Sequence, residues 1–270
     1  MTITDFRAPL PPSAGIDLDS PAIPFTRLVR VELRKLVDTR ASFWLTASIG
    51  LISATIMVAM LIANRNTPEN LDLGEFFGIM NIPTAIILPV LAILLVTGEW
   101  SQRTALTTFT IEPRRERIIG AKLTTAMIAA VAAVALALIL GVIGNGIAAV
   151  AYDDPAGAWE LGSAGFVNSF VIQAFGLLLG FGFAALILNT PGAIVAYFAL
   201  PTALSVLSEL VPWFKENLGQ WVDCTLTQMP FQSNEWASGG EWARLLVSAV
   251  VWVAIPLGLG VVRVMRSEIK

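Results

Sequence analysis

Six long apolar stretches restrict what this chain of 270 residues can fold into more than any other feature of its sequence. A helix that crosses the hydrocarbon core of a bilayer, about 30 Å thick, needs about 20 predominantly apolar residues. The stretches that meet this requirement are 42–63, 76–98, 123–150, 166–188, 192–211 and 245–262. Charged residues make up only 14% of the chain, against about 25% in a soluble domain. We therefore expect an all-α integral membrane protein with six transmembrane helices.

Lys and Arg residues are divided unequally between the two sides that six spans would create. All but three of the 17 lie on the side of the two termini, and the exceptions are Arg65, Lys215 and Arg244. Cytoplasmic segments carry an excess of Lys and Arg, so both termini are expected in the cytoplasm. One missed or invented span would spread these residues over both sides, so their distribution is an independent check on the number six.

The segment before the first span has two parts. Residues 1–23 are rich in Pro, Ser and Asp, which predicts a disordered cytoplasmic tail ahead of a six-span domain over 24–270. In residues 25–40 the apolar side chains follow helical spacing, which predicts an amphipathic helix in the inner headgroup layer. Glu32 falls on its apolar face and needs a partner there. This stretch either only sets the topology or also contacts a partner subunit, in which case Glu32, Arg34 and Lys35 are its candidate residues.

The loop after the second span, GEWSQRTALTTFTIEPRRERIIGAKL over 98–123, is the most informative stretch. Residues 101–109 can form about two helical turns, and Thr110 is expected to cap the next helix with Glu112 in its first turn. Beyond it, a cluster of basic residues is expected beside anionic lipid headgroups. The members of this cluster are Arg114, Arg115 and Arg117. The loop is either a polar connection with topogenic charges or a dock for a soluble protein.

Two further regions carry polar or aromatic residues in an apolar setting. Between the fifth and sixth spans, residues 212–243 have aromatic residues at helical spacing, which predicts short helices at or dipping into the outer interface. The alternative is a loop with aromatic residues at the membrane boundary.

The spans themselves contain a few polar side chains, for which helix–helix hydrogen bonds are favoured over substrate contact. These residues are Asn81, Asn145, Asn168, Gln173 and Glu209, the last near the outer end of its span.

The composition excludes several classes of chemistry. The chain has no His, only one Cys (Cys224), no phosphate-binding loop and no paired carboxylates within its spans. We therefore expect no catalytic, cofactor or metal site, and no enzyme. A net charge of −3 makes broad nucleic-acid binding unexpected. The spans carry few charges, which suits a hydrophobic or amphipathic cargo better than a small ion.

Four segments carry a resemblance to a known family. They are VELRKLVDTRASFWL at the first span, GEWSQRTALTTFTIEPRRERIIGAKL after the second, GLLLGFGFAALILNTPGAIVAYFALP over 176–201, and VVRVMRSEIK at the C-terminus. With these segments the chain resembles, from about residue 25 to 270, the membrane subunit (permease) of a bacterial ABC-2-type ABC transporter. One departure is Arg103, where the family pattern has glycine before Thr104.

The resemblance implies a function and a set of partners. Such permeases work in the cell inner membrane as two membrane subunits, identical or different, with two separate ATPase subunits, so ATP is bound by the partner. They carry a re-entrant helical pair between the fifth and sixth spans. Residues 101–109 would be the coupling helix, and its contacts with the ATPase would be Ser101, Thr104, Ala105, Leu106 and Phe109. The resemblance thus implies ATP-driven export; the alternative is a membrane anchor or regulator that does not transport.

Overall fold

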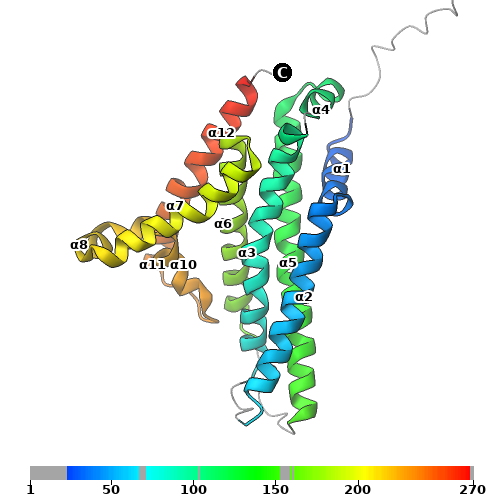
Figure 1. Cartoon of the computed structure of the whole chain (residues 1–270). Helices are drawn as coiled ribbons and strands as arrows, with labels where there is room; N and C mark the ends of the chain where they lie inside the picture. The colour runs from blue at the N-terminus through cyan, green and yellow to red at the C-terminus, as the bar shows by residue number, and fades with distance from the viewer. Residues whose placement is uncertain (1–22, 67–70, 103, 153–158, 160, 268–270) are drawn as a thin grey trace, which may run out of the picture.

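Figure 1 shows a computed structural model of the chain, which describes residues 23–66, 71–102, 104–152, 159 and 161–267. The predicted tail lies outside the described residues except for Ile23, and Arg103 lies outside them as well. The side chains of Ala105 and Phe109 are likewise not described, so the structure says nothing of their predicted contacts.

Six of the described helices are long and apolar enough to cross a membrane, which confirms the predicted number, and the chain is a multi-pass membrane protein. They are α2 (Arg40–Ala63), α3 (Leu73–Ser101), α5 (Arg115–Ala151), α6 (Ser163–Ile187), α7 (Thr190–Leu210) and a sixth helix, Gly239–Arg266, made of α11 (Gly239–Ala249), η4 (Val250–Ala254) and α12 (Ile255–Arg266). The residues that the structure describes contain no strand.

The third and sixth spans begin earlier in the structure than their apolar stretches do. Helix α5 starts at Arg115 because polar residues continue the helix beyond the apolar region, which a count of apolar residues does not detect. The sixth span starts at Gly239 because Ser238 and Glu241 form a capping box, in which the Ser238 amide donates to Glu241 Oε2 (2.6 Å). The helices are therefore longer than their membrane-crossing parts.

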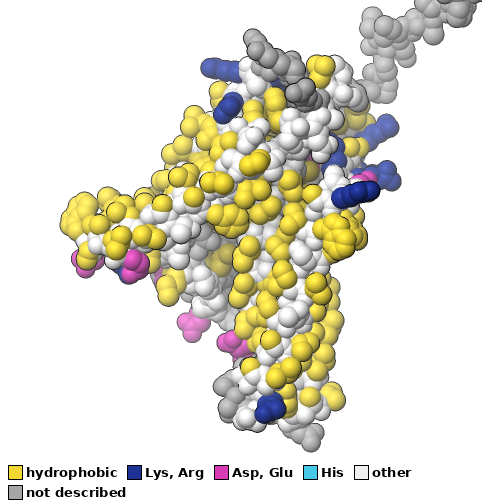
Figure 2. Space-filling model, in the orientation of Figure 1, with side chains coloured by type: hydrophobic (Ala, Val, Ile, Leu, Met, Phe, Trp, Pro, Cys, Tyr) yellow, Lys and Arg dark blue, Asp and Glu magenta, His cyan; other side chains and the backbone are white. Residues whose placement is uncertain are grey.

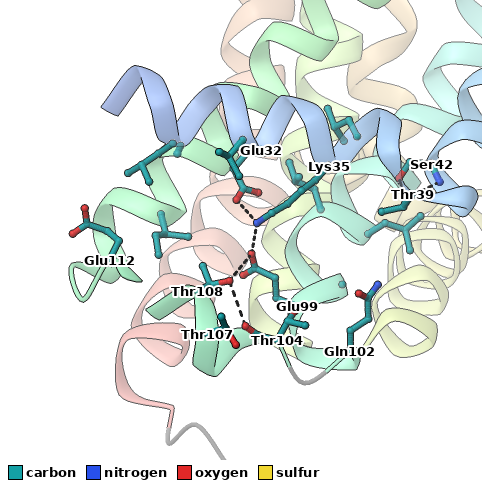
Figure 3. A pocket seen from close by; sticks show the side chains of 18 of the residues that line it. Glu32, Lys35, Thr39, Ser42, Glu99, Gln102, Thr104, Thr107, Thr108 and Glu112 are labelled. Carbon is teal, nitrogen blue, oxygen red and sulfur yellow. Dashed lines mark hydrogen bonds and ion pairs between the residues drawn. The ribbon is translucent and has the colours of Figure 1, made fainter. Parts of the chain in front are cut away.

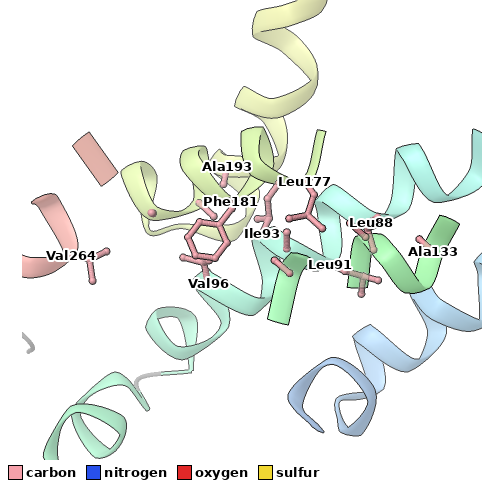
Figure 4. Close-up of a cluster of buried hydrophobic side chains, with 14 of the residues drawn as sticks. Leu88, Leu91, Ile93, Val96, Ala133, Leu177, Phe181, Ala193 and Val264 are labelled. Carbon is pink, nitrogen blue, oxygen red and sulfur yellow. The ribbon is translucent and has the colours of Figure 1, made fainter. Parts of the chain in front are cut away.

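The core lies where α3 packs against α5 and α6, and where α6 packs against α12. Buried Leu88, Ile93, Leu177 and Phe181 meet at its centre (Figure 4). A Cβ atom at Gly180 would lie 2.9 Å from the carbonyl oxygen of Pro89, so only glycine allows α6 to approach α3 this closely. In the most apolar part of α2 and of α7 only 11% of the residues are buried, against 56% in α3 and α6, so the rest of the chain leaves most of α2 and α7 uncovered.

Helix α7 leaves the bundle at an angle, and a run of short helices follows it (Figure 1). These are α8 (Pro212–Phe214), η2 (Lys215–Gly219), α9 (Gln220–Val222), α10 (Cys224–Gln228) and η3 (Met229–Gln232). The buried carboxylate of Asp223 joins them to α7, because it accepts from the hydroxyls of Ser205 (2.9 Å) and Ser208 (2.7 Å). It also accepts from the Thr225 amide (2.8 Å), so Asp223 caps α10.

The predicted helix boundaries in the loop after the second span were wrong. Ser101 is the last residue of α3, and α4 covers Ala105–Ile111 rather than 101–109. Thr110 lies inside α4, where its hydroxyl donates to the carbonyl of Thr107 (2.8 Å), so it does not cap the next helix. Glu112 lies in the connection before α5, which starts only after Pro113 because proline restricts the residue before it to an extended conformation.

Candidate functional site

A cavity of about 700 Å³ lies between α1 (Phe25–Asp38), the C-terminal end of α3, α4 and the first turns of α5 (Figure 3). We call it the α1–α4 cavity, and its volume is in the range of small-molecule pockets. Leu28, Leu36 and Leu94 are among its apolar lining residues, whereas Glu32 and Glu99 belong to its polar lining. The cavity therefore combines apolar walls with a charged patch.

Helix α1 is amphipathic, and its burial follows from that pattern. Val29 and Glu32 are buried, whereas Arg27, Arg30 and Arg34 are exposed, so the basic face points away from the protein. After α1, Thr39 caps α2, because its hydroxyl oxygen accepts from the amide of Ser42 (3.1 Å). The cap turns the chain from α1 into the first span without a long linker.

The charged patch consists of four residues, Glu32, Lys35, Glu99 and Lys122, which we call the charge quartet. Lys35 Nζ lies 2.5 Å from Glu32 Oε1 and 2.6 Å from Glu99 Oε1. Lys122 Nζ lies 2.8 Å from Glu32 Oε2 and 3.1 Å from Glu99 Oε1. Each carboxylate thus contacts both ammonium groups, and the quartet has no net charge. It joins α1, α3 and α5.

Burial makes this arrangement sensitive to the loss of any member. The side chains of Glu32, Glu99 and Lys122 are 5%, 9% and 6% exposed, whereas that of Lys35 is 34% exposed. Lys122 also donates to the carbonyl of Leu95 (2.9 Å). Buried ions are tolerated only when partners of opposite charge and hydrogen bonds compensate for lost water, and here every charge has two partners.

Lys35 is the member of the quartet that reaches solvent and lies outside the spans. Its partial burial alone would lower its pKa, but the nearby carboxylates of Glu99 and Glu32 outweigh burial and raise the pKa above its ordinary value. The Lys35 ammonium group therefore stays charged at neutral pH.

Helix α4 covers one side of the cavity and presents residues to solvent. Leu106 is 55% exposed, and Thr104 and Thr107 are exposed as well. The Thr108 hydroxyl lies 3.3 Å from Glu99 Oε1, which links α4 to the quartet (Figure 3). At the end of α4, Glu112 pairs with Arg117 of α5 at 2.5 Å. The predicted contact residues with described side chains are Ser101, at the end of α3, Thr104 and Leu106. All three are exposed, and Ser101 and Thr104 line the cavity.

The basic cluster that follows α4 has protein partners. Arg115 donates to the carbonyls of Val264 (2.8 Å) and Ser267 (2.9 Å), so it joins the start of α5 to the end of the sixth span. Arg117 pairs with Glu112 and also donates to the carbonyl of Ile23. Arg114 is exposed. The sequence suggested lipid headgroups for all three, whereas two of them contact protein.

The polar residues of the spans lie apart from the quartet. Gln173 of α6 donates to Thr84 Oγ1 (2.5 Å) and to the carbonyl of Asn81 (3.2 Å), both on α3. Asn168 of α6 donates to the carbonyls of Ser233 (3.0 Å) and Glu235 (2.8 Å). Gln173 thus links two helices, whereas Asn168 contacts the connection between η3 and α11. Two further residues complete the set: Asn145 is buried in α5, and exposed Glu209 pairs with Lys215 at 2.7 Å.

Sequence reasoning missed three members of these networks as site residues. Lys122 and Glu99 stand at the ends of apolar stretches, where they were assigned to topology and the membrane boundary. The sequence showed that Glu32 needed a partner, and Lys122, directly before the third apolar stretch, is one of several cations that could supply it. Asp223 could have been found from Ser205 and Ser208, two hydroxyls one turn apart in an apolar helix.

No group of three or more metal-binding side chains occurs in the part of the chain that the structure describes. The four groups of the quartet pair with one another, and these ion pairs hold α1, α3 and α5 together. No protein-family model and no curated protein matches this sequence.

Proposed function

We propose that this chain is the permease subunit of an ABC-2-type ABC exporter, which moves a hydrophobic or amphipathic substrate with energy from a separate ATPase subunit. The observation that carries the proposal is α4, a short helix between the second and third spans with an exposed apolar residue, Leu106. It lies at the same end of the bundle as α1 and the C-terminus (Figure 1). A soluble partner could therefore touch α1 and α4 together.

The proposal places this end of the molecule in the cytoplasm, with the spans in the bacterial inner membrane. Figure 2 supports the placement, because most of the visible Lys and Arg side chains gather at that end and apolar side chains cover the middle. The short helices after α7 lie away from that end, and we assign them to the outer interface as re-entrant segments. Exposed Trp213 and Trp221 suit such a position.

The mechanism that we propose is a two-state motion driven from another chain. ATP binding brings two ATPase subunits together, and the ATPase displaces α4 on each of two membrane subunits. Because α4 connects directly to α3 and α5, its displacement shifts the spans between inward-open and outward-open arrangements. This chain supplies the pathway and binds no nucleotide, and the few charges in the spans suit an apolar or amphipathic cargo.

Affinity purification of the full chain from native membranes tests the proposal. An ATPase with a Walker A motif should co-purify and hydrolyse ATP, and the Leu106→Glu variant should lose this partner. Arg65→Glu is the matched control, because exposed Arg65 follows the end of α2 that lies away from α1, so the partner should remain bound. If no ATPase associates, or if both variants keep it equally, α4 is not its docking site and the proposal fails.

A further inference from the structure

Three donors from three helices converge on one carboxyl oxygen of Glu99. Glu99 Oε1 lies 2.6 Å from Lys35 Nζ of α1, 3.1 Å from Lys122 Nζ of α5 and 3.3 Å from the Thr108 hydroxyl of α4. Its backbone carbonyl also accepts from the amide of Thr104 (2.9 Å), at the start of α4. Glu99 itself stands in the last turn of α3, so four helices meet at one residue.

This convergence matters because few of the α4 side chains that the structure describes are held in any other way. Of these, Thr104, Leu106, Thr107 and Thr110 are exposed, whereas Thr108 is half-buried and faces the quartet. Glu112 and Arg117 hold the far end of α4, and Arg117 also donates to the carbonyl of Ile23, just before α1. Among the described side chains of α4, Thr108 is the one that connects through Glu99 to Lys35, within α1.

Both helices that we assign to partner contact are thus fastened to the same carboxylate. Lys35 leads to α1, whose basic face is exposed, and Lys122 leads to α5, the third span. A buried ion pair holds its partners in one geometry more strictly than a surface pair, because leaving either charge alone and buried is strongly unfavourable. Movement of one helix would therefore carry the others with it.

We propose that Glu99 is a positioning residue that fastens α4, α1 and α5 into one rigid unit, so that a push on α4 moves the interfacial helix and the third span together. That an ATPase subunit supplies this push rests on the proposed function. The rigid unit itself needs no ATPase and can be measured on the full chain alone.

Distances between spin labels on the full chain in lipid nanodiscs test this unit. In a Cys224→Ser background, labels replace pairs of exposed residues: Arg34 on α1 with Thr107 on α4, and Arg34 with Glu116 on α5. The variants are Glu99→Gln, which removes the charge at the junction, and Thr108→Val, which removes only the side-chain hydrogen bond between α4 and Glu99. Glu112→Gln is the matched control, because it breaks the Glu112–Arg117 pair outside the junction.

We expect Glu99→Gln to abolish the narrow distance distribution of both pairs. Thr108→Val should broaden only the α1–α4 pair, and Glu112→Gln should leave both pairs narrow. Unchanged distributions in Glu99→Gln, or equal broadening in Glu112→Gln, would overturn the proposal. If Glu99→Gln does not fold, Thr108→Val decides, because it keeps all four charges: a narrow α1–α4 pair in that variant overturns the proposal. A negative result in these distance measurements would not affect the proposed binding of an ATPase. Failure to find an ATPase would not affect the measured distances.

Discussion

The molecule buries carboxylates in two different ways at two of its regions. At the α1–α4 cavity, Glu32 and Glu99 are each paired with two lysines, and only the Lys35–Glu32 contact lies within one helix. Beside α7, Asp223 is surrounded by neutral donors, namely two serine hydroxyls and backbone amides of α10. The first arrangement joins helices that are distant in sequence, and the second fixes a local turn. A buried charge thus either connects the fold or shapes one segment of it, depending on its partners.

The largest expected effect comes from removing a buried cation. Lys122→Met leaves two buried glutamates facing one lysine, and it should lower the free energy of unfolding by about 3–5 kcal/mol. Reversible unfolding in detergent micelles, compared with the wild-type chain, measures the difference. A loss no larger than that of Asp223→Asn would show that the quartet depends on its charges no more than the Asp223 site does.

A smaller effect is expected where neutral groups stabilise the carboxylate. Asp223→Asn keeps the shape of the side chain but removes the charge, and it should cost about 1.5–3 kcal/mol, as for hydrogen bonds to charged groups. The same unfolding measurement applies, with Ser205→Ala and Ser208→Ala as partners in double-mutant cycles. If the double variants show no coupling with Asp223→Asn, the hydroxyls do not hold this carboxylate.

The contribution of Lys35 to the free energy of unfolding should depend on pH, which gives a further test of the quartet. Because it is one-third exposed, Lys35→Met should cost about 1.5 kcal/mol, at the lower end for a charged hydrogen bond. Its pKa is raised by Glu99 and Glu32, so its contribution to stability is complete below the unfolded value of about 10.4. The difference between wild type and Lys35→Met should therefore stay constant from neutral pH to mildly alkaline pH and disappear as pH rises through the raised pKa. A difference that already vanished in mildly alkaline solution would contradict this.

The smallest effect is expected for an ion pair that water reaches. Lys215 and Glu209 lie 2.7 Å apart, but their side chains are 42% and 67% exposed. Lys215→Met should therefore change the free energy of unfolding by only about 0.2–1 kcal/mol. Added salt should weaken the wild-type pair further, whereas the quartet should respond little. A change as large as that of Lys122→Met would refute burial as the cause of the difference.

The sequence was informative where a property depends on neighbouring residues. Apolar length located all six spans, and helical spacing placed Glu32 on the buried face of α1. Sequence reasoning placed the boundaries of α4 incorrectly. Thr110 fits the pattern of a helix cap, but its hydroxyl donates to the carbonyl of Thr107 within α4. The need of Glu32 for a partner was also predictable.

The identity of that partner was not predictable, because it depends on how the helices pack. Lys122 is one of several cations at the ends of apolar stretches, and nothing in its neighbours distinguishes it from Arg117. Thr108 shows the same limit. Its hydroxyl is one of several in a Thr-rich stretch, and only the three-dimensional position of Glu99 selects it.

The sequence separation within the quartet also fixes an order of assembly. Lys122 follows Glu32 by 90 residues, and a ribosome synthesising about 5–20 residues per second needs several seconds to add them. During that interval the first two spans can enter the bilayer, but Glu32 has only Lys35 as a cationic partner and still lacks Lys122, the buried one. Helix α1 can therefore settle into its final place only after the third span has begun to insert, which makes this junction a late step in the biogenesis of the N-terminal half.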